Sequence, residues 1–477
     1  MKRAFAVGAG FGAALVVLGA RHLSVRAADE GTKPTPAAAF GCLAPPAIAP
    51  TLPADSLLTE QPEVNCFAWQ EFIALNWRAS KTDAGVPDPA AGPDTFGAPG
   101  AAAPVVWSTY KEASELFPKA GAVPAPWNAA QSAPAACGTG LPAGARGYRV
   151  LAATSKFSDD LADRDVLDEI DEAGVEPPAW LTDRRGRNVY YEVRVNQDYF
   201  NDVVDPQNAF YDARNQWAAT QPGGQGIDLP DRPSPYGAVG AMEVKAGWLE
   251  IDPSEYDQFL VTDALLVEAG RCRAAKVGLV GLHIIHKTAS MPNWTWATFE
   301  HVRNAPDRTQ VLRGTLAPPY TFFDPKCAPA TAPECQPNRK PQPGDPQDRP
   351  IQVVREVPLP PYVTQLNAAV HALIAQSSPQ SVFRNYVLVN ALWPQSGEGF
   401  SVGAHTPLSQ GAAAPTTGLA NATAETYVQH TTCLDCHQSA PIACSSASGP
   451  NPAVAADYTF QLSRASEPHR PAFCGQD

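Results

Sequence analysis

The distribution of ten cysteines along this chain of 477 residues is the strongest constraint on how it can fold. Two of them lie in the pentapeptide CLDCH at residues 433–437, and the other eight are spread between residues 42 and 474. Because eight is even, up to four disulfides can form in an oxidising compartment, although sequence alone does not fix their connectivity. We predict a bridge between Cys327 and Cys335, which enclose only seven residues, and a second between Cys444 and Cys474, which would tie the C-terminal tail back beside the pentapeptide.

The first thirty residues have the order of charges and apolar residues that is typical of a secretory signal peptide. Lys2 and Arg3 precede an uncharged apolar run from Ala4 to Ala20, and small residues around Ala27 form a cleavage site. An uncleaved membrane anchor is the alternative, since the run is near the lower length limit for a span. The run is rich in Gly and Ala, which favours cleavage after Ala27 and a periplasmic or secreted protein.

The composition predicts a folded chain with many loops. Hydrophobic residues make up 44% of the sequence and there are 10 tryptophans, which argues against general disorder, while 49 prolines predict extensive loops. The net charge of −13 disfavours binding to nucleic acid and to anionic lipid. Solubility alone is a sufficient explanation of that charge.

Local sequence patterns predict both strands and helices. Runs rich in β-branched and aromatic residues predict strands at residues 148–154, 189–195, 240–251 and 276–287. Helical spacing of apolar residues predicts helices at residues 65–77, 105–117 and 363–376, and an acidic surface helix is predicted at residues 159–174.

A proline-rich segment at residues 324–350 gives the clearest boundary signal in the chain. We therefore divide the sequence into a signal peptide at 1–27, a β-rich body at 28–350 and a C-terminal segment at 351–477. The predicted fold class is α+β, with a mostly antiparallel body and a more helical C-terminal segment. A single core shared by the two parts is left open.

The pentapeptide at residues 433–437 has the spacing that covalent haem attachment requires. Haem c is held by two thioether bonds, and two intervening residues let one helical turn present both sulfurs. The sequence therefore resembles the attachment motif of the c-type cytochromes. The resemblance implies one covalent haem c per chain, with Cys433 and Cys436 as attachment points and His437 as the proximal iron ligand. It covers only the pentapeptide and its flanks.

Two other interpretations of the pentapeptide stay open. A zinc site would need further ligands, which Cys444 and Cys474 could supply. A redox-active disulfide between Cys433 and Cys436 would also fit the spacing, but it leaves the adjacent histidine unexplained.

The late position of the motif limits how a haem could be enclosed. Forty residues follow His437, and none of them is methionine. The preceding chain must therefore help to bury the haem, unlike in small cytochrome modules, where the motif comes early. We expect Asn421 to cap a short helix that runs into the two cysteines.

Residues 281–302 hold the densest group of candidate sixth ligands. Met291 is the leading candidate because it precedes a proline on a predicted loop, and an open or water-bound position is the alternative. Since residues 276–287 are predicted to form a strand, His283 and His286 should point to opposite faces. The weaker candidates, each of which could instead be hydrogen-bonded in the core, are His283, His286 and His301.

Two classes of function follow from a haem c in a large exported chain. The first is periplasmic electron transfer with a redox partner that is basic enough to bind an acidic surface. The second is a haem-dependent oxidoreductase, peroxidase-like or oxygenase-like, that uses the large body to bind a small-molecule substrate. Large two-haem peroxidases and rubber-cleaving oxygenases have a similar size but carry two such motifs, whereas this chain has one. A haem-based sensor is a third possibility.

Overall fold

The computed structural model describes the following ranges of the chain: 40–100, 104–118, 121–131, 137, 148–151, 179–221, 223–231, 239–268, 271–317, 319–327, 332–342, 344–346, 348–394, 418–437, 440–443 and 456–465. The predicted signal peptide, the acidic helix at 159–174, Cys444 and Cys474 lie outside these ranges. Among the described helices, none has the length and apolar character needed to cross a membrane.

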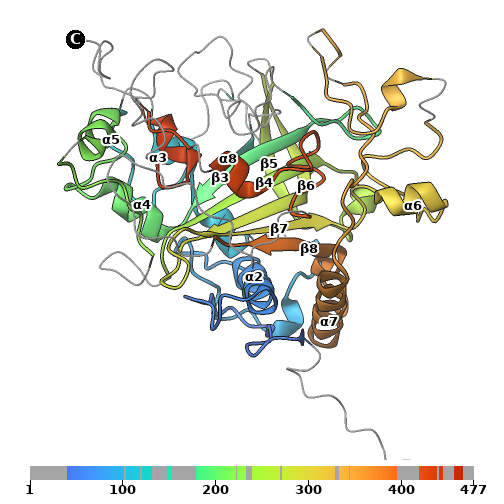
Figure 1. Ribbon diagram of the computed structural model, residues 1–477, viewed down its shortest axis with the longest axis horizontal. Helices are drawn as coiled ribbons and strands as arrows, with labels where there is room; N and C mark the ends of the chain where they lie inside the picture. Colours follow the sequence, from blue (N-terminus) through green and yellow to red (C-terminus); the bar gives the residue numbers. More distant parts are fainter. Residues whose placement is uncertain are drawn as a thin grey trace, which may run out of the picture. The chain divides into compact units, whose positions relative to one another are not determined.

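An eight-stranded sheet forms the centre of the fold (Figure 1). The strands are β1 (Lys111–Glu112), β2 (Arg149–Leu151), β3 (Val189–Val195), β4 (Met242–Glu250), β5 (Val261–Glu268), β6 (Arg271–His286), β7 (Thr295–His301) and β8 (Tyr386–Leu392). The spatial order is β1-β3-β4-β6-β5-β2, and β7 pairs with β6 and β8. The pairings of these strands are antiparallel except for the parallel pair β2–β5.

Strand β6 organises this sheet because it pairs with three other strands. Residues 271–278 of β6 pair with β5, and residues 281–286 pair with β7. On its other edge, residues 277–286 pair with β4. A strand of 16 residues is long enough to serve two neighbours in succession along one edge.

Helices accompany a mostly antiparallel sheet, so the chain has an α+β fold. The α-helices are α2 (Gln61–Leu75), α3 (Ala113–Leu116), α4 (Gln197–Val204), α5 (Ala213–Thr220), α6 (Arg308–Arg313), α7 (Pro361–Ser377) and α8 (Cys433–His437). The 3₁₀ helices are η1 (Pro93–Thr95), η2 (Val106–Thr109), η7 (Pro253–Glu255), η8 (Pro333–Cys335), η9 (Val382–Asn385) and η10 (Phe460–Arg464). In Figure 1, α2 and α7 lie below the sheet and α8 lies above it.

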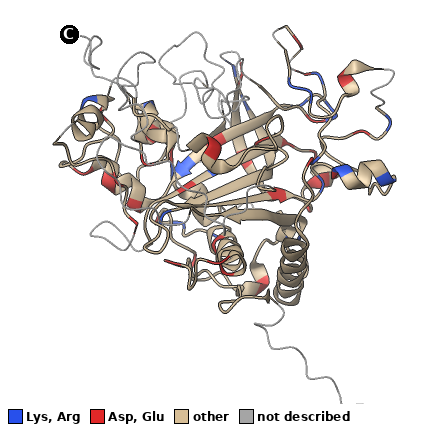
Figure 2. Ribbon diagram, viewed as in Figure 1, with Lys and Arg blue, Asp and Glu red and all other residues tan. Residues whose placement is uncertain are grey.

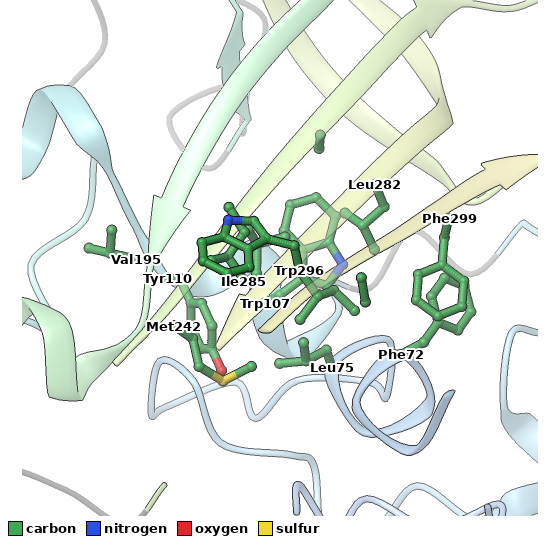
Figure 3. Close-up of a cluster of buried hydrophobic side chains, with 14 of the residues drawn as sticks. Phe72, Leu75, Trp107, Tyr110, Val195, Met242, Leu282, Ile285, Trp296 and Phe299 are labelled. Atoms are coloured by element: carbon green, nitrogen blue, oxygen red, sulfur yellow. The ribbon is translucent and has the colours of Figure 1, made fainter. Parts of the chain in front are cut away.

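The packing of α2 against the sheet forms a large part of the core. Trp69 and Phe72 are fully buried, and Phe72 stacks on Phe299 of β7 with ring centroids 4.5 Å apart (Figure 3). The indole of Trp69 donates a hydrogen bond of 3.0 Å to Asn367 of α7. Helix α7 contains no Lys, Arg, Asp or Glu, as Figure 2 shows, so its contact with the sheet is made without charged groups.

The segment after residue 351 contributes to the same sheet and core as the body. It supplies α7 and α8 as well as strand β8, and β8 pairs with β7. One buried cluster includes Phe72 of α2, Leu282 of β6 and Phe460 of η10. Side chains that are distant in sequence therefore pack together.

The predicted helix at residues 105–117 is wrong. The chain there forms η2, then strand β1 and then α3. Lys111 and Glu112 of β1 pair with β3, and the indole of Trp107 donates a hydrogen bond of 3.0 Å to Asn76. These tertiary contacts override the local helical spacing.

Three disulfides join described cysteines: Cys42–Cys66, Cys137–Cys272 and Cys327–Cys335. The last of these was predicted from its short separation and is confirmed. Three disulfides are consistent with an exported protein, because such bonds persist in oxidising compartments. Neither Cys433 nor Cys436 is in a disulfide.

His301 gives the fold a dependence on pH. The ring stacks on Phe259, its Nε2 donates to the carbonyl of Gln258 at 3.0 Å, and its Nδ1 accepts from the backbone N–H of Arg303 at 3.2 Å. Burial lowers the pKa of His301 to about 3. The unfolded chain, in which this pKa is near its ordinary value of 6.5, therefore binds a proton that the folded chain does not bind.

We predict that His301 lowers the free energy of unfolding as the pH falls from about 6.5 towards 3, by up to about 1.4 kcal/mol per pH unit. His301→Gln should flatten this acid limb in denaturant titrations at several pH values. His430→Gln, at an exposed histidine, is the matched control and should leave the slope unchanged. Equal slopes for the wild type and His301→Gln would contradict the prediction.

Candidate functional site

A cavity of about 70 Å³, partly open to solvent, lies against α8 and the sheet face that α2 does not cover. This volume is below the range of about 300–1,000 Å³ that is usual for small-molecule and cofactor sites. One wall comes from β4, β6 and β7, and the opposite wall comes from residues 419–437. The side chains from the sheet are Glu243, Lys245, His283, Ile285 and Trp296, and those from α8 are Cys433, Cys436 and His437.

The register of the three strands gathers the five sheet side chains on one face. Lys245 is opposite His283, Glu243 is opposite Ile285, and Ile285 is in turn opposite Trp296. Since alternate residues of a strand point to opposite faces, the next histidine along β6 points away from the cavity. His286 is instead within 2.6 Å of Glu71 on α2, so the predicted separation of His283 and His286 is confirmed.

Hydrogen bonds to the sheet hold the segment that leads to α8. The Asn421 side chain donates to the carbonyl of Phe299 at 2.6 Å, and the backbone N–H of Ala422 donates to Glu300 at 2.9 Å. The Tyr191 hydroxyl donates to the carbonyl of Thr423 at 2.6 Å. These contacts fix the chain about ten residues before the two cysteines.

Asn421 does not cap a helix, contrary to the sequence prediction. Its side-chain oxygen accepts from the backbone N–H of Thr423 at 2.9 Å in a turn, and the helix begins only at Cys433. The Asn421 side chain bonds both to the sheet and to Thr423, and its carbonyl accepts from the backbone N–H of Glu425. These bonds form a turn, and no helix follows it before Cys433 in the described residues 418–437.

Helix α8 is a single turn that its flanking residues stabilise. The backbone N–H of Thr432 donates to the Asp435 carboxylate at 2.6 Å, and the backbone N–H of Asp435 donates back to the Thr432 hydroxyl at 3.3 Å. This reciprocal pair is a capping box with Asp at its third position. Leu434 is buried, so the turn is anchored while the cysteines on either side of it face the cavity.

The His437 ring is held in one tautomer. Its Nδ1 is 2.7 Å from the carbonyl oxygen of Tyr458, and a carbonyl can only accept, so Nδ1 carries the hydrogen. The Nε2 atom therefore carries the lone pair. Trp296 and Phe460 contact the ring at centroid distances of 5.9 and 5.2 Å. Loss of hydration lowers the pKa of His437 to about 4, which keeps the imidazole neutral at pH 7.

The thiol of Cys433 is in its protonated form at neutral pH. Loss of hydration raises its pKa above the ordinary value, and the negative charge of Glu425 acts in the same direction. A neutral thiol and a neutral imidazole thus line the same cavity.

His283 lines the cavity, and its Nε2 atom makes no hydrogen bond to the described residues. The residue is 9% exposed, and its Nε2 is 3.4 Å from a carboxylate oxygen of Glu425. The geometry is not that of a hydrogen bond, and this nitrogen has no hydrogen-bond partner among the described residues. A buried nitrogen without a partner at the edge of a cavity is able to bind an occupant.

The other three predicted sixth ligands are not brought to the cavity. Met291 is 1% exposed and packs in the main core. His286 contacts Glu71 through Nδ1 and the carbonyl of Val239 through Nε2, at 2.6 and 2.8 Å. Both nitrogens of His301 are likewise used in hydrogen bonds. His283 is the one member of the four that lines the cavity.

Sequence reasoning missed two parts of this site. Glu425, which lines the cavity beside His283, lies in a turn-rich segment where no periodic pattern marks its direction. The carbonyl of Tyr458 is a backbone group, and the sequence carries no signal for it.

No family model, curated protein or solved structure matches the chain. Within the described ranges, no three His, Cys, Asp or Glu side chains are grouped so that they could hold a metal ion. The inference about function therefore depends on the cavity and on the chemistry of the side chains that line it.

We predict that Gly281→Ala destabilises the protein by about 1–3 kcal/mol, the usual cost of overpacking. A Cβ atom there would lie 2.4 Å from the Thr423 hydroxyl and 3.0 Å from the Asn421 side chain, and so would push the 421–423 turn off the sheet. Chemical denaturation measures the loss.

Gly247→Ala is the matched control, because Gly247 is paired with Gly281 across the sheet. Its added Cβ would meet neighbours only at 3.4–3.5 Å, which is ordinary contact. Equal effects of the two substitutions would show that the turn does not depend on close approach to β6.

Proposed function

We propose that this chain is an exported c-type cytochrome that binds one covalent haem and transfers electrons in the periplasm. The observation that carries the proposal is the His437 tautomer: Nδ1 donates to the Tyr458 carbonyl, which leaves the Nε2 lone pair available as an iron ligand. Metal-ligating histidines typically donate their second ring nitrogen in this way. Cys433 and Cys436 line the same cavity and supply the two thiols that haem c attachment needs.

The composition of the cavity walls suits a porphyrin. Ile285 and Trp296 offer apolar surface for the macrocycle, and Lys245 offers a positive charge for a haem carboxylate. When bound, the haem would supply reversible one-electron chemistry at iron, which the protein tunes through its axial ligands and the surrounding polarity. The net charge of −13 favours a basic redox partner.

His283 is the residue that we propose as sixth ligand. It is the one candidate from residues 281–302 that lines the cavity, and its Nε2 has no hydrogen-bond partner among the described residues. Ligation by two histidines gives a lower reduction potential than ligation by histidine and methionine. We therefore expect a low-potential electron carrier.

A haem-dependent oxidoreductase is the second candidate, and one observation favours it. Glu243, Lys245 and Glu425 put three ionisable side chains on the cavity wall near His283, which an electron carrier does not require. If the sixth iron position were open, these groups and His283 would face a small-molecule substrate. Binding of carbon monoxide separates the two functions.

Haem attachment is tested by replacing both cysteines of the pentapeptide. We predict that Cys433→Ala with Cys436→Ala abolishes haem staining of the denatured protein, because no thioether bond can form. The protein should be expressed in a host that attaches haem c. Cys327→Ala with Cys335→Ala, which removes one disulfide outside the cavity, is the control and should keep the stain. Unstained wild-type protein would refute the proposed cofactor.

The sixth ligand is tested by carbon monoxide binding to the reduced protein. We predict a six-coordinate spectrum that carbon monoxide leaves unchanged in the wild type, and rapid binding in His283→Ala. Met291→Leu and His301→Gln are matched controls and should behave like the wild type. Rapid binding by the wild type would exclude a tight His283 ligand and would favour the oxidoreductase.

A further inference from the structure

We propose that the buried ion pair between Lys287 and Asp457 is a positioning device that sets the hydrogen bond from His437 to the Tyr458 carbonyl and so tunes the reduction potential. This inference rests on the proposed haem function. Neither residue lines the cavity, so each would act on His437 only through the backbone that carries the carbonyl.

The ion pair is fully enclosed. Lys287 is 1% exposed and Asp457 is 0% exposed, and Nζ of Lys287 is 2.7 Å from Oδ2 of Asp457. Lys287 also pairs with Asp228, whose side chain is largely exposed. Burial lowers the pKa of Lys287, but the two carboxylates outweigh burial and raise it above its ordinary value, so the ammonium stays charged. Removal of either partner would leave a buried charge.

The lysine is fixed to the sheet and the aspartate to the chain beside His437. Lys287 follows the last residue of β6, and its backbone N–H donates to the carbonyl of Ala241 at 2.9 Å. Asp457 directly precedes Tyr458, whose carbonyl accepts from His437. The ion pair therefore connects the end of β6 to the residue next to the accepting carbonyl.

The backbone at this point is in a conformation that it would not adopt without support. Asp457 and Tyr458 have φ angles of 49° and 63°, in the left-handed region that residues other than glycine seldom occupy. Such residues persist where surrounding contacts hold them. Besides Lys287, the indole of Trp294 donates to the Asp457 carbonyl at 2.9 Å, and the backbone N–H of Leu229 donates to its carboxylate at 2.8 Å.

The position of the carbonyl matters because a histidine that donates from Nδ1 becomes a stronger donor at Nε2. A stronger imidazole donor stabilises ferric over ferrous iron and lowers the reduction potential. If the ion pair is lost, the two left-handed residues can relax and the 2.7 Å hydrogen bond lengthens. The potential should then rise.

The test uses the charge-neutral double variant Lys287→Met with Asp457→Asn in the full chain. One positive and one negative charge disappear together, so the long-range field at the iron changes little. We expect the equilibrium for reduction to shift about tenfold towards the ferrous form, a factor equal to the lower end of the roughly 10–100-fold changes in metal affinity or activity that loss of such outer partners causes. For one electron, a tenfold shift is about 59 mV.

The second readout is the tautomer of His437 in the haem-free protein, measured by ¹⁵N NMR on histidine-labelled Cys433→Ala with Cys436→Ala. We expect the Nδ1–H form alone with the ion pair intact, and a mixture of tautomers once it is removed. This measurement does not need haem. An unstained wild type would therefore refute the proposed function and still leave the positioning of His437 testable.

The control is Arg149→Met with Glu192→Gln, which removes the buried Arg149–Glu192 ion pair of the same sheet, and with it the contact of Glu192 with Arg194, without net change in charge. It should lower stability and leave both the potential and the tautomer unchanged. If Lys287→Met with Asp457→Asn does not fold, Trp294→Phe keeps both charges of the ion pair but removes the indole hydrogen bond to Asp457 and the indole ring beside the Lys287 ammonium, and it should give a smaller shift in the same direction. An unchanged potential and tautomer in the variants that fold would overturn the proposal.

Discussion

The alternation of side chains along β6 is the constraint on which the rest of the structure depends. This strand pairs with β4, β5 and β7, so its register fixes the sheet. Because neighbouring side chains point to opposite faces, one short stretch serves both layers: Leu282 and His286 face α2, and His283 and Ile285 face the cavity. A slip of one residue would exchange these two sets and would remove His283 from the cavity.

Helix α8 could not hold its position by its own hydrogen bonds, because a single helical turn is unstable in isolation. Hydrogen bonds to residues that are distant in sequence set its position. Tyr191 and Glu300 bind the chain before the helix, and the Tyr458 carbonyl binds His437 at its end. The pentapeptide thus lies on one wall of a site whose other wall comes from the central sheet.

The sequence was sufficient for the features that depend on local spacing. It predicted strands at β3, β4 and β6, the opposite directions of His283 and His286, and the Cys327–Cys335 bridge. It was insufficient where a tertiary contact decides. Met291 ranked above His283 because it precedes a proline on a loop, yet that loop folds into the core. Nor could any pattern of side chains identify the backbone carbonyl of Tyr458 as the partner of His437.

The two histidines that line the cavity differ in their hydrogen bonding. His437 has a complete hydrogen bond at Nδ1, which orients its other nitrogen, whereas Nε2 of His283 is buried and has no hydrogen-bond partner among the described residues. A buried polar atom without a partner costs about 1–3 kcal/mol. Such a cost is offset when an occupant of the cavity supplies the missing interaction. The strain in the chain beside one histidine and the unsatisfied nitrogen of the other therefore both favour a cavity that is built around a bound group.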